Sequence, residues 1–140
     1  MIFLSTELNS NLDLTIIEKK SYKILTFLSL EDKDLSILFV DDKRIKELNL
    51  QFRGIDKVTD VLSFSQNEGV LNLSNMLGDV VISLEQAKRQ APLSNNSYEQ
   101  EVLYLIIHSV LHLIGYDHYN DIESKIMRAK EKLIFDSIEL

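Results

Sequence analysis

The stretch from Tyr98 to Ile114 constrains the fold most strongly, because it has helical spacing and carries apolar residues on almost every face. A helix that is apolar all round has to be covered on all sides, so we expect it at the centre of the domain. Gly115 is placed to end this helix in the left-handed conformation. At 140 residues, the chain is long enough to build a hydrophobic core without disulfides or structural metal ions. A single domain over residues 1–140 is therefore predicted.

Periodicity and turn residues predict the other elements. Apolar or β-rich runs predict strands at residues 2–8, 35–40, 58–64 and 79–83. Helical spacing predicts helices around residues 16–28, 44–50 and 84–90, and after residue 120. The expected N-caps of the last three are Asp41–Asp42, Ser83 and Asn120. A surface loop is expected over residues 69–76.

Two of these helices are expected to be amphipathic. The helix after residues 41–42 carries Ile45, Leu48 and Phe52, and the last helix carries Ile126, Met127, Leu133 and Ile134. The predicted fold class is α+β, with a small mixed sheet of about four strands, about five helices and one central buried helix.

All three histidines of the chain lie within residues 108–118, as His108, His112 and His118. Residues four apart share one face of a helix, so His108 and His112 can bind one metal ion, and a reversal at Gly115 lets His118 supply a third nitrogen. Three neutral nitrogen ligands suit zinc and leave its fourth position for water or substrate. Because the chain has no cysteine, its metal ligands have to be His, Asp or Glu.

Other interpretations of these histidines stay open from the residues alone. They could be core or surface histidines, or they could form a closed structural zinc site with Asp117 as the fourth ligand. Their spacing also equals that of the metzincin proteases, HExxHxxGxxH, but Ser109 stands where those enzymes carry the glutamate that acts as general base. A metzincin-like metalloprotease or another zinc hydrolase is therefore an alternative function.

Charge and hydropathy limit the partners. The chain has 22 acidic and 15 basic residues, and its formal charge of −7 argues against a broad basic nucleic-acid surface and against DNA as a partner. A metal ion and a few placed cations can still hold a phosphate. The apolar start of the chain is four residues long, and no run approaches the length of a membrane span. We expect a cytoplasmic protein with no membrane partner.

The segment His108–His118 resembles the HGxLHLxGYDH signature of the YbeY family, which comprises bacterial metal-dependent endoribonucleases linked to ribosomal RNA maturation. Further matching blocks follow the family order, at Leu48–Asn49, Phe52–Gly54, Thr59–Phe64, Leu77–Ser83 and Met127–Glu131. The chain departs from the family pattern where Ser109 replaces a glycine and where Val58 and Ser65 replace prolines.

This resemblance implies one YbeY-like endoribonuclease domain with one Zn²⁺ per chain, held by the three histidines. It implies a single-strand-preferring enzyme that acts in 16S ribosomal RNA 3′-end maturation and in ribosome assembly or quality control. It further implies that Arg53 lines the active cleft and acts on the RNA, where a guanidinium suits a phosphate. Asp60 and Asp79 lie in matching blocks and are candidates for orienting a histidine.

The expected partners are ribosomal RNA and components of the small ribosomal subunit. Because so acidic a chain should bind free RNA weakly, delivery by a ribosomal protein or an assembly factor is expected. A structural-zinc module that binds ribosomal partners without turnover is the second alternative function.

Overall fold

The computed structural model describes residues 1–66 and 75–139. Its strands are β1 (Ile2–Thr6), β2 (Asp34–Val40), β3 (Val61–Ser65) and β4 (Met76–Ser83). Its α-helices are α1 (Leu14–Phe27), α2 (Asp42–Arg53), α3 (Leu84–Gln90), α4 (Tyr98–Leu113) and α5 (Asp121–Ile138), and a short 3-10 helix spans Pro92–Ser94. The predicted α+β class is confirmed.

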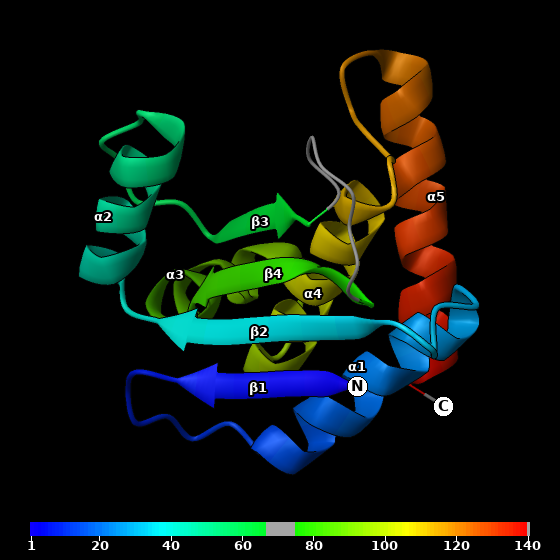
Figure 1. The fold of residues 1–140 in the computed structure, drawn as a ribbon, viewed down its shortest axis with the longest axis horizontal. Helices are drawn as coiled ribbons and strands as arrows, with labels where there is room; N and C mark the ends of the chain where they lie inside the picture. Colours follow the sequence, from blue (N-terminus) through cyan, green and yellow to red (C-terminus); the bar gives the residue numbers. More distant parts are fainter. Residues whose placement is uncertain (67–74, 140) are drawn as a thin grey trace.

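The strands form one mixed sheet in the order β1-β2-β4-β3 (Figure 1). Strands β1, β2 and β4 are parallel, and β3 runs antiparallel to β4 at the edge of the sheet. In the β3–β4 pair, Val61 lies opposite Ile82 and Ser65 lies opposite Gly78. The last residues of β3 therefore pair with the first residues of β4.

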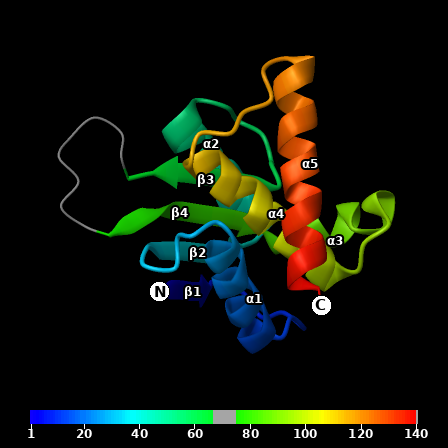
Figure 2. The same ribbon diagram turned by 90° about the vertical axis from the view of Figure 1, so that its right-hand side faces the viewer.

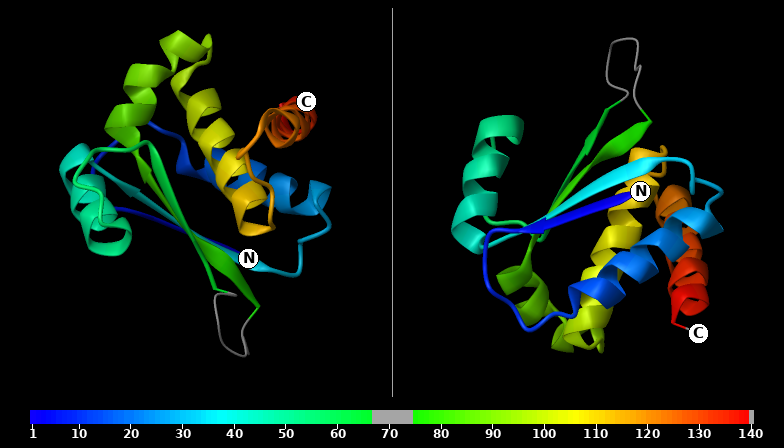
Figure 3. Two further views of the ribbon diagram at one scale, coloured as in Figure 1. Left: turned by 90° about the horizontal axis from the view of Figure 1, so that it is seen from above. Right: turned by 60° about the horizontal axis from the view of Figure 1, so that its bottom comes forward.

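Helices cover the two faces of the sheet unequally. Helices α1, α4 and α5 lie on one side of the sheet, with α4 between the sheet and α5, whereas α2 lies on the other side (Figure 3). The larger core lies on the α4 side, and α2 packs through Ile45 and Leu48 on a smaller one. Most of α4 is buried, as its apolar sequence predicts. Figure 2 shows α5 lying across α4.

Gly78 permits close approach of α4 to the edge of the sheet. A Cβ atom at this position would lie 2.5 Å from the backbone oxygen of Phe64 and 2.7 Å from a side-chain carbon of Leu113. Real Cβ atoms do not approach other atoms so closely, so only glycine fits here. Because Leu113 ends α4, this contact sets how near the histidine-bearing end of the helix lies to β3 and β4.

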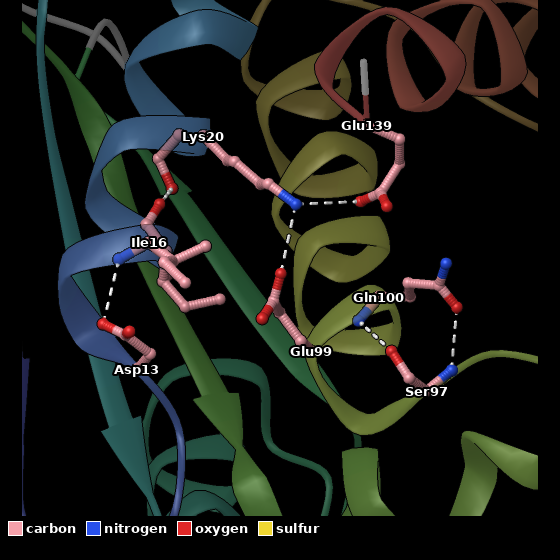
Figure 4. A network of polar contacts seen from close by, with 9 residues as sticks. Asp13, Ile16, Lys20, Ser97, Glu99, Gln100 and Glu139 are labelled. Atoms are coloured by element: carbon pink, nitrogen blue, oxygen red, sulfur yellow. Dashed lines mark hydrogen bonds and ion pairs between the residues drawn. The ribbon is translucent and has the colours of Figure 1, made fainter.

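Polar groups fix the other end of α4. Ser97 caps the helix by accepting a hydrogen bond from the Gln100 backbone, and the Gln100 side chain accepts one from the Ser97 backbone (Figure 4). The ammonium of Lys20 on α1 forms ion pairs with Glu99, at 3.1 Å, and with Glu139, at 3.3 Å. One lysine thus joins α1, α4 and the end of α5.

The predicted N-caps are confirmed. The side chains of Asp41, Ser83 and Asn120 each accept a hydrogen bond from a backbone amide of the first turn of α2, α3 and α5. Within residues 1–66 and 75–139, the structure has no helix that combines the length and the apolar character needed to cross a membrane.

Several predicted bounds were wrong. Strand β1 ends at Thr6, β3 begins at Val61, β4 begins at Met76 and α2 extends to Arg53. Residues 67–74, which include most of the predicted loop, lie outside the described residues.

The predicted apolar faces of α2 and α5 also need correction. Phe52, Ile126 and Leu133 are each more than half exposed. The buried stripe of α5 consists of Met127, Glu131, Ile134 and Ile138, at spacings of four, three and four residues. Ile126 and Leu133 each lie one residue before a member of this stripe, which turns them about 100° away from it.

Candidate metal centre

The end of α4 and the turn that follows it bring the three histidines together. His108 and His112 lie one helical turn apart, and their Nε2 atoms are 3.1 Å from each other. Gly115, with a φ of 106°, reverses the chain so that His118 returns toward the helix. One nitrogen from each ring lies within 4.8 Å of those of the other two. The chain reversal expected at Gly115 is therefore present.

The surroundings of His112 favour its neutral imidazole. Burial, and after it the neighbouring rings of His108 and His118, lowers the pKa of His112 below its ordinary value. Two Nε2 atoms at 3.1 Å are close enough to share a proton or to bind a common cation. Three neutral nitrogen donors are a ligand set that Zn²⁺ accepts, with a fourth position left for water or substrate.

Asp117 does not complete a four-ligand site. Its Oδ1 accepts a hydrogen bond from the His118 backbone and lies 3.9 Å from Nδ1 of His118. Within the part of the chain that the structure describes, the metal-ligating cluster comprises the histidines without a carboxylate. This arrangement favours an open site over the closed structural site that Asp117 would form.

Glu131 on α5 contacts a ring nitrogen of the cluster at hydrogen-bond distance. Its Oε1 atom lies 3.0 Å from Nδ1 of His108, and its side chain is 3% exposed. The sequence interpretation missed this residue as an orienting group. Glu131 is a charged residue in the otherwise apolar stripe of α5. This signal can be recognised only once the structure shows which face of α5 is buried.

Asp60 and Asp79 do not orient a histidine, so that interpretation was wrong. The Asp79 carboxylate accepts a hydrogen bond from Gln66 at 2.8 Å, and Asp60 accepts one from Gln90 at 3.2 Å. Neighbouring residues of a strand point to opposite faces of the sheet. Because Val80 faces the larger core on the α4 side, Asp79 faces the α2 side, away from the histidines.

Ser109 is buried, and its hydroxyl makes no hydrogen bond within the described residues. The position that holds the general base in metzincin proteases therefore carries no carboxylate, and its hydroxyl has no hydrogen-bond partner among the described residues.

Arg53 is the last residue of α2, and within the described part of the chain its side chain contacts β3 and none of the histidines. Its guanidinium donates a hydrogen bond of 2.8 Å to the backbone oxygen of Ser63, and its central carbon lies 4.8 Å from the centre of the Phe64 ring. Both contacts are to β3, and the side chain is otherwise exposed. Phe52 and Phe64 line a groove of about 380 Å³ between α2 and the sheet. Arg53 on α2 and the histidines His108 and His112 on α4 thus lie on helices that both contact β3.

Comparisons with known proteins agree with this architecture. A family model described as Endoribonuclease YbeY matches residues 5–139. A protein of Clostridioides difficile named Endoribonuclease YbeY is 44% identical over 133 residues, which cover 89% of this chain and 87% of that protein. A protein of the same name from Desulforamulus reducens is 46% identical over 112 residues, covering 76% of this chain and 73% of its own length.

A solved structure extends the similarity to the fold. The solution structure of TM1509 from Thermotoga maritima superposes with a TM-score of 0.69 at 32% identity, and the match covers 99% of this chain and 89% of that one.

Proposed function

The chain belongs to the YbeY endoribonuclease family, and from this membership and its histidine cluster we propose that it is a zinc-dependent endoribonuclease that prefers single-stranded RNA. The observation that carries the proposal is the convergence of three imidazoles within 4.8 Å at the end of a buried helix. The family supplies the substrate class, and the ligand set supplies the choice of zinc.

Each functional residue has a distinct role in this proposal. His108, His112 and His118 hold one Zn²⁺ per chain. Bound there, the ion would supply Lewis acidity toward a phosphate oxygen and would acidify a water molecule. The guanidinium of Arg53 binds and orients a phosphate of the RNA, because its planar fork suits phosphate oxygens. Its exposure leaves it accessible to a large substrate.

Ribosomal RNA is the substrate that we propose, with maturation of the 16S RNA 3′ end and ribosome assembly or quality control as the roles. This activity would place the protein in the cytoplasm. A chain with a net charge of −7 has little general attraction for RNA phosphates, so we propose that a ribosomal protein or an assembly factor of the small subunit brings it to its substrate.

The proposal is tested by incubating the purified protein with a fragment of 16S RNA that includes the unprocessed 3′ end. Parallel reactions contain a chelator, the chelator followed by added zinc, or an unfolded protein in place of RNA. We expect RNA cleavage that the chelator stops and zinc restores, with no peptide products. Peptide cleavage would favour a metalloprotease, and bound zinc without turnover of either substrate would favour a structural-zinc module.

A further inference from the structure

The buried stripe of α5 contains one charged residue, Glu131. Its neighbours in the stripe are Met127, Ile134 and Ile138, and the whole residue is 2% exposed. Removing a carboxylate from water is unfavourable unless hydrogen bonds and an opposite charge compensate it. A core position that holds a glutamate therefore requires a physical explanation.

The contacts of Glu131 compensate it only in part. Oε1 lies 3.0 Å from Nδ1 of His108, whereas Oε2 is buried without a hydrogen-bond partner among the described residues. Tyr104, one turn before His108, stacks its ring on the His108 ring with centres 6.5 Å apart. Burial, and then the carboxylate of Glu131, raises the pKa of Tyr104 well above its ordinary value. The carboxylate thus lies beside two polar groups of α4, the imidazole of His108 and the hydroxyl-bearing ring of Tyr104.

The contact with His108 has a chemical consequence, because the two ring nitrogens of a neutral imidazole have different roles. The nitrogen that faces a carboxylate carries the proton and donates it, and the other nitrogen presents its lone pair. In His108 the nitrogen facing Glu131 is Nδ1, and Nε2 faces the second histidine at 3.1 Å.

We propose that Glu131 is a positioning residue that holds His108 as the Nδ1–H tautomer, with the Nε2 lone pair directed into the histidine cluster for a divalent cation. This inference rests on the proposed metal site. A cation held by the cluster would also bring a positive charge near the buried carboxylate. A carboxylate that accepts the free N–H of a ligating histidine orients the ring and strengthens the ligand.

Zinc affinity is the first measurement, by competition with a chromogenic chelator. Glu131→Gln keeps an oxygen acceptor but removes the charge, and we expect its affinity for zinc to fall about tenfold. Glu131→Leu removes both and should lower the affinity about a hundredfold. The matched control is Glu101→Gln, which alters a buried carboxylate of α4 whose hydrogen-bond partners are Gln90 and Asn96 rather than a histidine. Its zinc affinity should stay within about twofold of the parent, since it leaves the contact that orients His108 intact.

The tautomer of His108 is the second measurement, by nitrogen-15 NMR of the metal-free protein at neutral pH. We expect Nδ1–H at His108 in the parent and in Glu131→Gln, and loss of this preference in Glu131→Leu. This readout separates orientation from simple stabilisation of the α4–α5 contact, which would leave the tautomer unchanged.

The two measurements distinguish failure of the inference from failure of the proposed function. A parent protein that binds no zinc would overturn the metal site, and the tautomer measurement would still decide the role of Glu131. If the parent binds zinc and Glu131→Gln binds it as tightly as Glu101→Gln does, the positioning role is overturned alone. An Nε2–H tautomer at His108 in the parent would overturn it in either case.

Discussion

The two sides of the sheet hold the side chains proposed to act in catalysis in different ways. On the α4 side, His108 and His112 project from a buried helix, and the buried Glu131 from α5 contacts the first of them. On the α2 side, Arg53 is exposed and contacts β3 through one hydrogen bond and one ring. Substitutions on the α4 side should therefore affect metal binding and stability, whereas loss of Arg53 should affect turnover alone.

The largest effect should come from His112→Ala. Removing one of three nitrogen ligands leaves too few for an open zinc site, so zinc affinity should fall more than about a hundredfold, beyond the loss expected for an outer hydrogen-bond partner. Elemental analysis of the dialysed protein measures bound zinc, and circular dichroism checks the fold. A folded His112→Ala protein that keeps a full equivalent of zinc would rule out the three-histidine site.

Arg53→Ala should isolate the α2 side. We expect RNA cleavage to slow by roughly tenfold to a thousandfold, the range for loss of one donor to developing negative charge, with zinc content and melting temperature unchanged. Arg44→Ala is the matched control, because Arg44 lies on the same helix and forms exposed ion pairs with Glu7 and Glu47. If both variants cleave RNA at the parental rate, Arg53 has no part in the reaction.

Acidification should release zinc from the α4 side. Each histidine has to be neutral to bind, so protons compete for the ligands as the pH falls below about 6.5. Burial, and after it the neighbouring histidines, lowers the pKa of His112, so this ligand stays neutral to a lower pH than an ordinary histidine does. Zinc release measured from pH 8 to pH 5 should rise steadily through this range. A constant affinity would show that the ligands are not imidazoles.

Gly78→Ala should disturb the contact between α4 and the sheet. A Cβ atom there would overlap the Phe64 backbone and Leu113, so we expect a loss of about 1–3 kcal/mol in the free energy of unfolding, together with weaker zinc binding. Gly54→Ala is the counterpart on the α2 side, where a φ of 72° is strained for alanine but no atom lies close. It should cost about 1–2 kcal/mol and leave zinc affinity unchanged. Equal effects on zinc would contradict the special role of Gly78.

The smallest effect should come from Ser109→Ala, which removes a buried hydroxyl that makes no hydrogen bond to any of the residues the structure describes. We expect the free energy of unfolding to stay constant or to rise by about 1 kcal/mol, since alanine also favours the helix. Urea unfolding measures it. A clear loss of stability would mean that the hydroxyl is engaged in solution.

The sequence predicted best what depends on local spacing. An all-round apolar helix has to be buried, and four-residue spacing places His108 and His112 on one face, so α4 and the approach of the histidines followed from residues near one another. The N-caps, and the helices and strands from which the α+β class was predicted, likewise depend on residues near one another in the sequence.

Features that depend on packing between distant segments were not predictable in this way. Glu131 lies 23 residues after His108, and its contact depends on which face α5 turns toward α4. Asp79 was misinterpreted because its matching block does not reveal which face of β4 points to the histidines. The position of Arg53 likewise depends on where α2 ends relative to β3, and its role was suggested by the family resemblance alone.

Because β3 is an edge strand, its contact with Arg53 also bears on how the sheet could associate with other chains. An outermost strand exposes backbone groups that can pair with a strand of another chain, and proteins discourage this with charged side chains along the edge. Arg53 donates to the Ser63 carbonyl of this outermost strand and brings a positive charge beside it. The residue proposed to bind an RNA phosphate thereby also occupies a backbone acceptor of β3 with which a strand of another chain could otherwise pair.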